Sequence, residues 1–171
     1  MDRLSEDEVY LRMAEARGQR SYATRYKVGA LLVKDNQIVS DGYNGMPRDF
    51  PNDEMELRDT QGNLYTNPLA IHAEANIFDK MSCNGSSIGA KGATLYLALS
   101  PCVPCAVRII NNKVVRVVFR NYYRDHSGVE LLRSKTKIEI VHLPATEEKA
   151  DETPSRKHGF WKTLYEYIVN R

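Results

Sequence analysis

The order of apolar and polar positions predicts helices and strands in alternation along most of the chain. The first helix is expected to begin at Ser5, because Ser5-Glu6-Asp7-Glu8 forms a capping box, and to end near Gly18. Two apolar runs, 27–33 and 38–40, flank a short polar stretch and predict a hairpin of two strands. The chain is therefore expected to start with a helix and an antiparallel strand pair.

The later part of the chain shows a regular strand–helix order. A helix is predicted over 70–81, where apolar residues recur at helical spacing. The segments that follow are predicted as a strand at 93–99, a helix at 102–112, a strand at 114–120, a helix at 127–133 and a strand at 137–143. Strands that alternate with helices favour a layered α/β fold in which the strands pair in parallel.

Two segments interrupt this order. Residues 46–71 contain three prolines, five acidic residues and two arginines with little periodicity, so we expect an insertion or lid. Residues 144–155 are charged and contain two prolines, which predicts a linker to a C-terminal amphipathic helix at 156–171. The whole chain, 1–171, is interpreted as one domain, since its length suits a single core.

Charge and hydropathy narrow the class of protein. The 24 basic residues nearly balance the 22 acidic ones, a net charge of +2, which argues against a nucleic-acid surface. The longest apolar run, Val28–Val33, is far shorter than the roughly 20 residues that span a bilayer, so no membrane partner is expected. The first residues lack the apolar core of a signal peptide, which predicts a cytoplasmic protein.

The three cysteines are too few, and odd in number, for a disulfide framework. Cys102 and Cys105 stand three residues apart at a predicted helix start, where they share a face and the helix dipole favours thiolates. His72 is the candidate third ligand of a metal ion, and three protein ligands leave the open position typical of catalytic zinc. Glu74 is placed to transfer protons to and from a water molecule. Cys83 lies at the far end of the helix that follows His72 and is expected to be an inert thiol.

Each of the two motifs has a structural alternative when it stands alone. A C-x-x-C pair can be a redox dithiol, and an H-x-E triplet can be an ordinary helix start. Their joint presence, with prolines at 101 and 104, favours a catalytic zinc site over both alternatives. An H-x-E…P-C-x-x-C arrangement is the signature of zinc-dependent nucleobase deaminases.

The chain resembles the zinc-dependent cytidine/deoxycytidylate deaminase superfamily. The stretches that carry the resemblance are Val28-Gly29-Ala30, Gly42-Tyr43-Asn44-Gly45-Met46-Pro47, His72-Ala73-Glu74 and Ser100-Pro101-Cys102-Val103-Pro104-Cys105-Ala106. The G-Y-N-G-x-P stretch is similar to the deoxycytidylate (dCMP) branch. The resemblance implies a three-layer α/β/α fold with a five-stranded mixed sheet. It also implies hydrolysis of dCMP to dUMP with release of ammonia, which supplies dUMP for thymidylate synthesis.

The same resemblance implies the roles of individual residues. Those that would hold zinc and carry the proton are His72, Cys102, Cys105 and Glu74. Those that would line the pocket for base and sugar are Ala73, Ser100 and Asn44. Several relatives bind a second zinc ion through the segment before H-x-E, but residues 46–71 contain no Cys or His, so one zinc ion per chain is predicted.

The resemblance also extends to regulation. Gly42, Tyr43, Asn44 and Gly45 are similar to the segment that is tied in this family to allosteric control, in which dCTP activates and dTTP inhibits. Mg²⁺ is a candidate companion of the dCTP effector. Members of the family usually form homohexamers, so a homo-oligomer is expected here.

The phosphate of a nucleoside monophosphate needs cationic or hydroxyl donors around it. Tyr122, Tyr123 and Arg124 are candidates because they follow a predicted strand, and Arg25 and Arg48 are rivals. Each arginine could equally be a solvated surface side chain. The sequence therefore leaves the phosphate contacts open.

Other functions remain as alternatives. A related deaminase could act on free cytidine, on a base within tRNA or on a pterin-like ring, and a zinc-stabilised binding module would perform no catalysis. The near-neutral charge and the acidic segment 46–71 favour a small nucleotide over RNA. Glu74 favours an enzyme, because a structural zinc site has no need of an acid beside an open ligand position.

Overall fold

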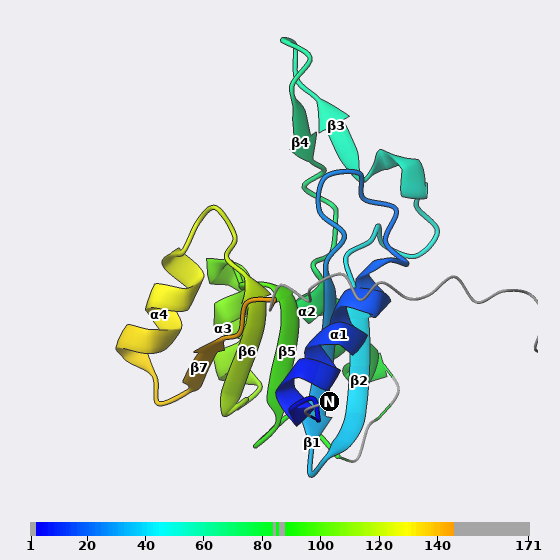
Figure 1. Cartoon of the computed structure of the whole chain (residues 1–171). Coiled ribbons are helices and arrows are strands. Elements are labelled where there is room, and N and C mark those ends of the chain that lie inside the picture. The colour runs from blue at the N-terminus through cyan, green and yellow to red at the C-terminus, as the bar shows by residue number, and fades with distance from the viewer. Residues whose placement is uncertain (1–2, 84, 86–87, 146–171) are drawn as a thin grey trace, which may run out of the picture.

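A five-stranded mixed sheet forms the centre of the computed structural model, which describes residues 3–83, 85 and 88–145 (Figure 1). The strands of this sheet are β1 (Gly29–Lys34), β2 (Gln37–Tyr43), β5 (Thr94–Leu99), β6 (Arg116–Asn121) and β7 (Glu139–His142). Their order across the sheet is β2-β1-β5-β6-β7. β1 is antiparallel to both of its neighbours, whereas β5, β6 and β7 are parallel. The predicted mixed sheet and its parallel pairings are confirmed.

Helices cover both faces of the sheet, which gives three layers (Figure 1). The helices are α1 (Glu6–Gly18), α2 (Ala73–Cys83), α3 (Val103–Asn111) and α4 (Ser127–Lys135). Successive residues of β1 point to opposite faces. Leu31 therefore packs with Leu11 of α1, while Leu32 packs with Ile77 of α2 on the other face. The α/β/α arrangement expected from the resemblance is present.

Local sequence signals explain where the first elements begin and turn. The Ser5 hydroxyl accepts a hydrogen bond from the Glu8 backbone N–H at 3.2 Å, as the predicted capping box requires. The turn between β1 and β2 contains Asp35 and Asn36, whose φ angles are 50° and 58°. Two consecutive left-handed residues match the twist of a two-residue hairpin, and Asp and Asn tolerate that conformation.

The second helix begins later than predicted. It starts at Ala73, not at residue 70, because the preceding backbone bonds elsewhere. Ile71 donates its N–H to the Gly45 carbonyl at 2.8 Å and accepts from the Gly45 N–H at 3.0 Å. This bridge ties the segment before α2 to the end of β2.

Residues 46–71 contain more structure than the hydrophobic pattern predicts. A 3-10 turn at Asn52–Glu54 precedes a small antiparallel hairpin of β3 (Glu56–Arg58) and β4 (Leu64–Thr66), and we name residues 52–66 the arm. The hairpin projects from the body of the molecule (Figure 1). Its strands are three residues each and largely exposed, so they lack the buried alternation that marks a strand in sequence.

The predicted C-terminal helix at 156–171 lies outside the described residues, as does all but the start of the predicted linker at 144–155. Among the helices that the structure does describe, none combines the length and the apolar character needed to cross a bilayer.

A buried arginine joins the N-terminal helix to the sheet. Arg120 of β6 is 2% exposed, and its guanidinium donates to Glu8 at 2.9 and 3.0 Å, to Glu15 at 3.1 Å and to the Leu143 carbonyl at 3.0 Å. The hydrogen bond from Arg120 lowers the pKa of Glu8, so the carboxylate stays charged. A single arginine within an apolar run carries no signal of its burial, so the sequence does not predict this role for Arg120.

We predict that Arg120→Ala strongly destabilises the fold, because it leaves a cavity, removes the cation paired with Glu15 and removes one of the two arginines that bind Glu8, the other being Arg12. The free energy of unfolding should fall by about 3 kcal/mol, the lower end of the range for a broken buried pair, since Glu15 is partly exposed. Urea unfolding measures this directly. The matched control is Arg108→Ala, which removes an exposed ion pair with Asp79 and should cost less than about 1 kcal/mol. Equal losses in the two variants would contradict the prediction.

Candidate active site

The candidate metal ligands lie at the starts of two neighbouring helices. His72 directly precedes α2, and its carbonyl accepts the N–H of Asn76 at 3.0 Å. Cys102 is the N-cap residue of α3, and its carbonyl accepts the N–H of Ala106 at 2.8 Å. Cys105 follows within the first turn of α3, so the C-x-x-C spacing places both sulfurs at one helix end.

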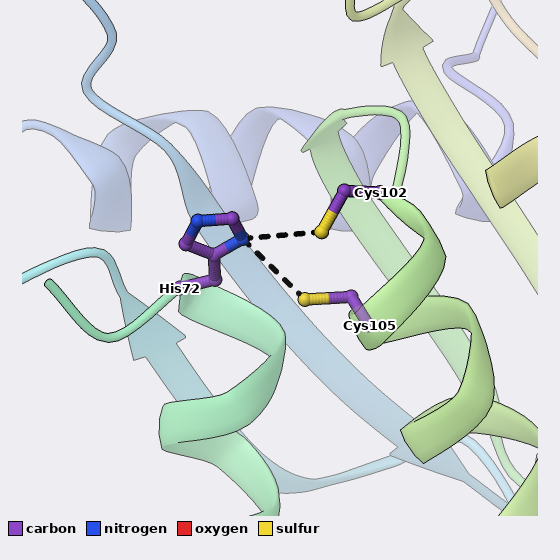
Figure 2. Close-up of side chains that lie close together, drawn as sticks. All are labelled: His72, Cys102 and Cys105. Carbon is purple, nitrogen blue, oxygen red and sulfur yellow. Dashed lines mark hydrogen bonds between the residues drawn. The ribbon is translucent and has the colours of Figure 1, made fainter. Parts of the chain in front are cut away.

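The three side chains converge on one point (Figure 2). Nδ1 of His72 lies 3.5 Å from Sγ of Cys102 and 3.5 Å from Sγ of Cys105. All three ligand atoms lie within 4.8 Å of one another. One imidazole nitrogen and two sulfurs form a donor set that suits zinc, so the residues present fit the ion that the sequence analysis expects.

The electrostatics of this cluster favour a metal cation. The pKa of Cys102 is lowered, because its thiolate accepts hydrogen bonds from the Cys105 thiol and from the His72 ring. The partial positive charge at the start of α3 acts in the same direction. The pKa of His72 is raised by its hydrogen bond to Cys102 and by attraction to Glu74. Metal binding would displace the protons that the cluster otherwise shares.

Glu74 lies in the first turn of α2 and is 4% exposed. Burial raises the pKa of its carboxyl group to about 7, because the carboxylate is removed from water. A carboxyl group with a pKa near neutrality can both accept and donate a proton during a reaction. Glu74 therefore has the chemistry of an acid–base residue, placed two positions from His72.

The cluster opens into a cavity lined by residues from several elements. The lining residues are Arg25, Tyr26, Val28, Asn44, Met55, Glu56, Thr66, Ala70, His72, Ala73, Glu74, Leu99, Ser100, Cys102, Tyr123 and Arg124. Most of the residues selected from the sequence for substrate binding therefore face one space. Two do not: Arg48 is exposed outside it, and Tyr122 packs against Phe119 and His142 with ring centroids 4.8 and 4.6 Å apart.

Comparison with known proteins assigns the chain to a family. A family model described as the cytidine and deoxycytidylate deaminase zinc-binding region matches residues 4–121, more than half of the chain. The chain belongs to the cytidine and deoxycytidylate deaminase family.

The alignments of this deaminase-family chain with individual relatives cover different fractions of those proteins. It is 36% identical over 121 residues to the deoxycytidylate deaminase of Homo sapiens, which covers 69% of this chain and 66% of that protein. It is 35% identical over 128 residues to the deoxycytidylate deaminase of Mycobacterium phage D29, covering 70% of this chain and 97% of that protein. The chain thus spans slightly under two thirds of the human relative and nearly all of the phage relative.

A solved structure of a phage protein supports the fold. The dCMP deaminase from the cyanophage S-TIM5, crystallised in complex with dCMP and dUMP, matches with a TM-score of 0.72 and 35% identity. The match covers 82% of this chain and 100% of that chain.

Two of the predicted binding residues of this deaminase-family site also shape its walls. The Asn44 side chain accepts from the Val28 N–H at 2.9 Å and donates to the Tyr26 carbonyl at 2.8 Å. The Ser100 hydroxyl accepts from the Tyr123 N–H at 2.8 Å. Both side chains hold neighbouring lining segments in place, which is a role that motif spacing does not reveal.

The predicted regulatory segment contacts the start of α2. A Cβ atom on Gly42 would lie 2.5 Å from the Ala73 carbonyl oxygen, so only glycine allows this approach. Gly45 forms the backbone bridge to Ile71, and the Tyr43 ring lies under the Arg17 guanidinium at 5.0 Å. The segment is therefore packed next to the helix that carries Glu74.

Sequence reasoning missed the arm's contribution to the cavity. Met55, Glu56 and Thr66 line it, although none belongs to a motif. An acidic residue in a proline-containing insertion is indistinguishable in sequence from an ordinary surface residue. Only the path of the chain in space shows that Glu56 reaches the site.

We predict that the purified protein binds one zinc ion per chain and that Cys105→Ser abolishes this binding. The serine oxygen is a harder and less acidic donor, so the variant loses a thiolate from the cluster. Elemental analysis after dialysis measures the zinc-to-chain ratio. Cys83→Ser is the matched control, because Cys83 is an exposed free thiol, and it should retain the wild-type ratio. Two zinc ions per wild-type chain, or full retention in Cys105→Ser, would contradict the prediction.

Proposed function

We propose that this protein catalyses the zinc-dependent hydrolytic deamination of dCMP to dUMP and ammonia, and so supplies dUMP for thymidylate synthesis. The observation that carries the proposal is the cluster of three donor residues, His72, Cys102 and Cys105, beside a cavity that His72, Cys102 and the buried carboxyl group of Glu74 line. An acid–base residue beside three metal donors is suited to hydrolysis, because three protein ligands would leave a fourth position of a zinc ion open to water.

Different residues of the site have different roles in the proposed reaction. His72, Cys102 and Cys105 would hold a zinc ion, and the chemistry it would supply is a lowered pKa of water, which would make hydroxide available near neutral pH. Glu74 accepts one proton from that water and delivers it to N3 of the cytosine, then accepts the second proton from the hydroxyl group formed at C4 and delivers it to the leaving amino group. Water oxygen forms a bond to C4, the C4–N bond breaks, and ammonia leaves. Ala73 and Ser100 hold the base, largely through backbone groups.

The residues that line the cavity favour a nucleoside monophosphate as the substrate. The relatives in Homo sapiens and in phage D29 are deoxycytidylate deaminases, and the S-TIM5 structure contains dCMP and dUMP. In this chain Arg25 and Arg124 both line the cavity, with Arg124 5.6 Å from the centre of the Tyr123 ring. We propose that these two arginines and Tyr123 surround the phosphate, with Asn44 at the sugar.

We also propose that dCTP, with Mg²⁺, activates the enzyme and that dTTP inhibits it, in a homohexamer. The basis is the resemblance of Gly42–Gly45 to the regulatory segment of the family. The contact between Gly42 and Ala73 supports the idea, because displacement of the segment would move the start of α2. That helix carries Glu74 and follows His72.

We predict that dCMP is deaminated faster than CMP, deoxycytidine, dCTP or RNA when each is offered at the same concentration. The two arginines in the cavity should favour a monophosphate over an uncharged nucleoside. An ammonia-release assay, repeated with dCTP or dTTP present, measures both selectivity and regulation. Strong activity on cytidine or RNA with none on dCMP would assign the site to another substrate.

We predict that Glu74→Gln retains the metal and the fold but lowers kcat by about 10²–10⁴-fold, because glutamine cannot carry the proton. Zinc content, thermal unfolding and dCMP turnover should be measured on the same preparation. Glu130→Gln, at an exposed position of α4, is the matched control and should leave turnover unchanged. Turnover at the wild-type rate in Glu74→Gln would remove Glu74 from the mechanism.

A further inference from the structure

The arm forms part of the wall of the active-site cavity. Met55, Glu56 and Thr66 of the arm line the same space as His72 and Glu74. The hairpin beyond them extends away from the body of the molecule (Figure 1). The arm therefore contacts the substrate space through its base, where β3 begins and β4 ends.

Glu56 binds the loop that enters the cavity from α1. Its carboxylate accepts from the Thr24 N–H at 3.1 and 3.2 Å, from the Thr24 hydroxyl at 3.1 Å and from the Arg25 N–H at 3.3 Å. These residues are more than 30 positions apart in sequence. Because hydrogen bonds to a carboxylate are stronger than those to a neutral acceptor, Glu56 fixes the backbone from which the Arg25 side chain extends.

Arg25 in turn binds the other strand of the arm. Its Nη1 donates to the Leu64 carbonyl at 3.0 Å, and its Nη2 donates to the Thr66 hydroxyl at 2.7 Å. Thr66 is the direct register partner of Glu56 across the hairpin. The three residues thus form one hydrogen-bond network. Glu56 binds the backbone of Arg25, and Thr66 binds its guanidinium.

This network gives the Arg25 guanidinium no anionic partner. Within the part of the chain that the structure describes, Arg25 forms no ion pair, and its buried Nε has no hydrogen-bond partner. A buried donor without a partner is costly, and an anion beside the guanidinium would relieve that cost. A phosphomonoester is an anion that arginine binds through several of its donors at once.

We propose that Glu56 is a positioning residue that acts through Arg25 to make the cavity selective for a nucleoside monophosphate over the uncharged nucleoside. The proposal rests on the proposed deaminase function and adds to it a residue outside every recognised motif. Thr66 completes the arrangement by fixing the direction of the guanidinium. Neither residue takes part in the chemistry at C4.

The test separates binding of the phosphate from the chemical step. Glu56→Gln keeps the shape of the side chain but weakens the bonds to Thr24 and Arg25, and Thr66→Val removes one acceptor of the guanidinium. We expect Glu56→Gln to raise KM for dCMP about tenfold, the effect of one lost charge-assisted hydrogen bond, without a change in kcat. Thr66→Val should act in the same direction to a smaller extent. For deoxycytidine, kcat/KM should stay at the wild-type value in both variants.

A double-mutant cycle tests whether Glu56 acts through Arg25. Arg25→Gln should also raise KM for dCMP, and the combined Arg25→Gln/Glu56→Gln variant should lose no more than Arg25→Gln alone. Glu54→Gln is the matched control, since it makes the same change at an exposed position of the arm and should leave both substrates unaffected. Thermal unfolding of every variant accompanies the kinetics.

The outcomes are distinguishable. Equal proportional losses for dCMP and deoxycytidine in Glu56→Gln and Thr66→Val would show a merely structural arm and overturn the proposal. Additive effects in the cycle, or a wild type that treats both substrates alike, would also overturn it. If Glu56→Gln does not fold, the kinetics of Thr66→Val and Arg25→Gln on dCMP and deoxycytidine still test whether the arm determines the selectivity. A wild type that deaminates no cytosine nucleotide would instead refute the proposed function.

Discussion

The close approach of the N-termini of α2 and α3 is the constraint on which the rest of the site depends. Three contacts impose it. The bridge between Gly45 and Ile71 and the packing of Gly42 on Ala73 fix the start of α2 against the end of β2. At α3, a Cβ atom on Gly128 would collide with the carbonyl oxygens of Pro101 and Cys102, so the start of α4 presses directly on the chain entering α3. Backbone packing thus fixes the positions of the segments that carry the three donors.

The same arrangement accounts for a buried carboxyl group among thiols. A carboxylate removed from water is unfavourable, and the raised pKa of Glu74 expresses that cost. Two helix N-termini place partial positive charge near the group and near Cys102, which favours the anionic forms. The site therefore combines a carboxyl group of raised pKa, Glu74, with a thiol of lowered pKa, Cys102, on helices that pack against an apolar core.

How much of this could be predicted from sequence depends on whether the signal is local. The N-cap at Ser5, the polar turn at 35–36 and the C-x-x-C pair at 102–105 each lie within a few residues, and the structure contains all three. Among the described residues, the second bond of the capping box is absent, because the Glu8 carboxylate binds Arg12 and Arg120 instead. The fold class follows from the order of strands and helices. Arg120 was missed because its partners lie more than 100 residues away on α1. Glu56 was missed for the same reason, since its partners Thr24 and Arg25 lie more than 30 positions away in sequence.

The chemistry and the selectivity of the site rest on parts of different stability. Glu74 and Cys105 belong to helices packed on the central sheet, where apolar burial is extensive, and His72 directly precedes one of these helices. The arm has two strands of three residues, and the apolar group at its base joins Met55 to Ala23 and Met46. A segment with little apolar burial opens at a lower free energy than the core, and its hydrogen bonds with Thr24 and Arg25 are partly exposed. Substitutions in the arm can therefore alter substrate selectivity without moving the metal donors. Substitutions near the N-termini of α2 and α3 change both the selectivity and the positions of the donors.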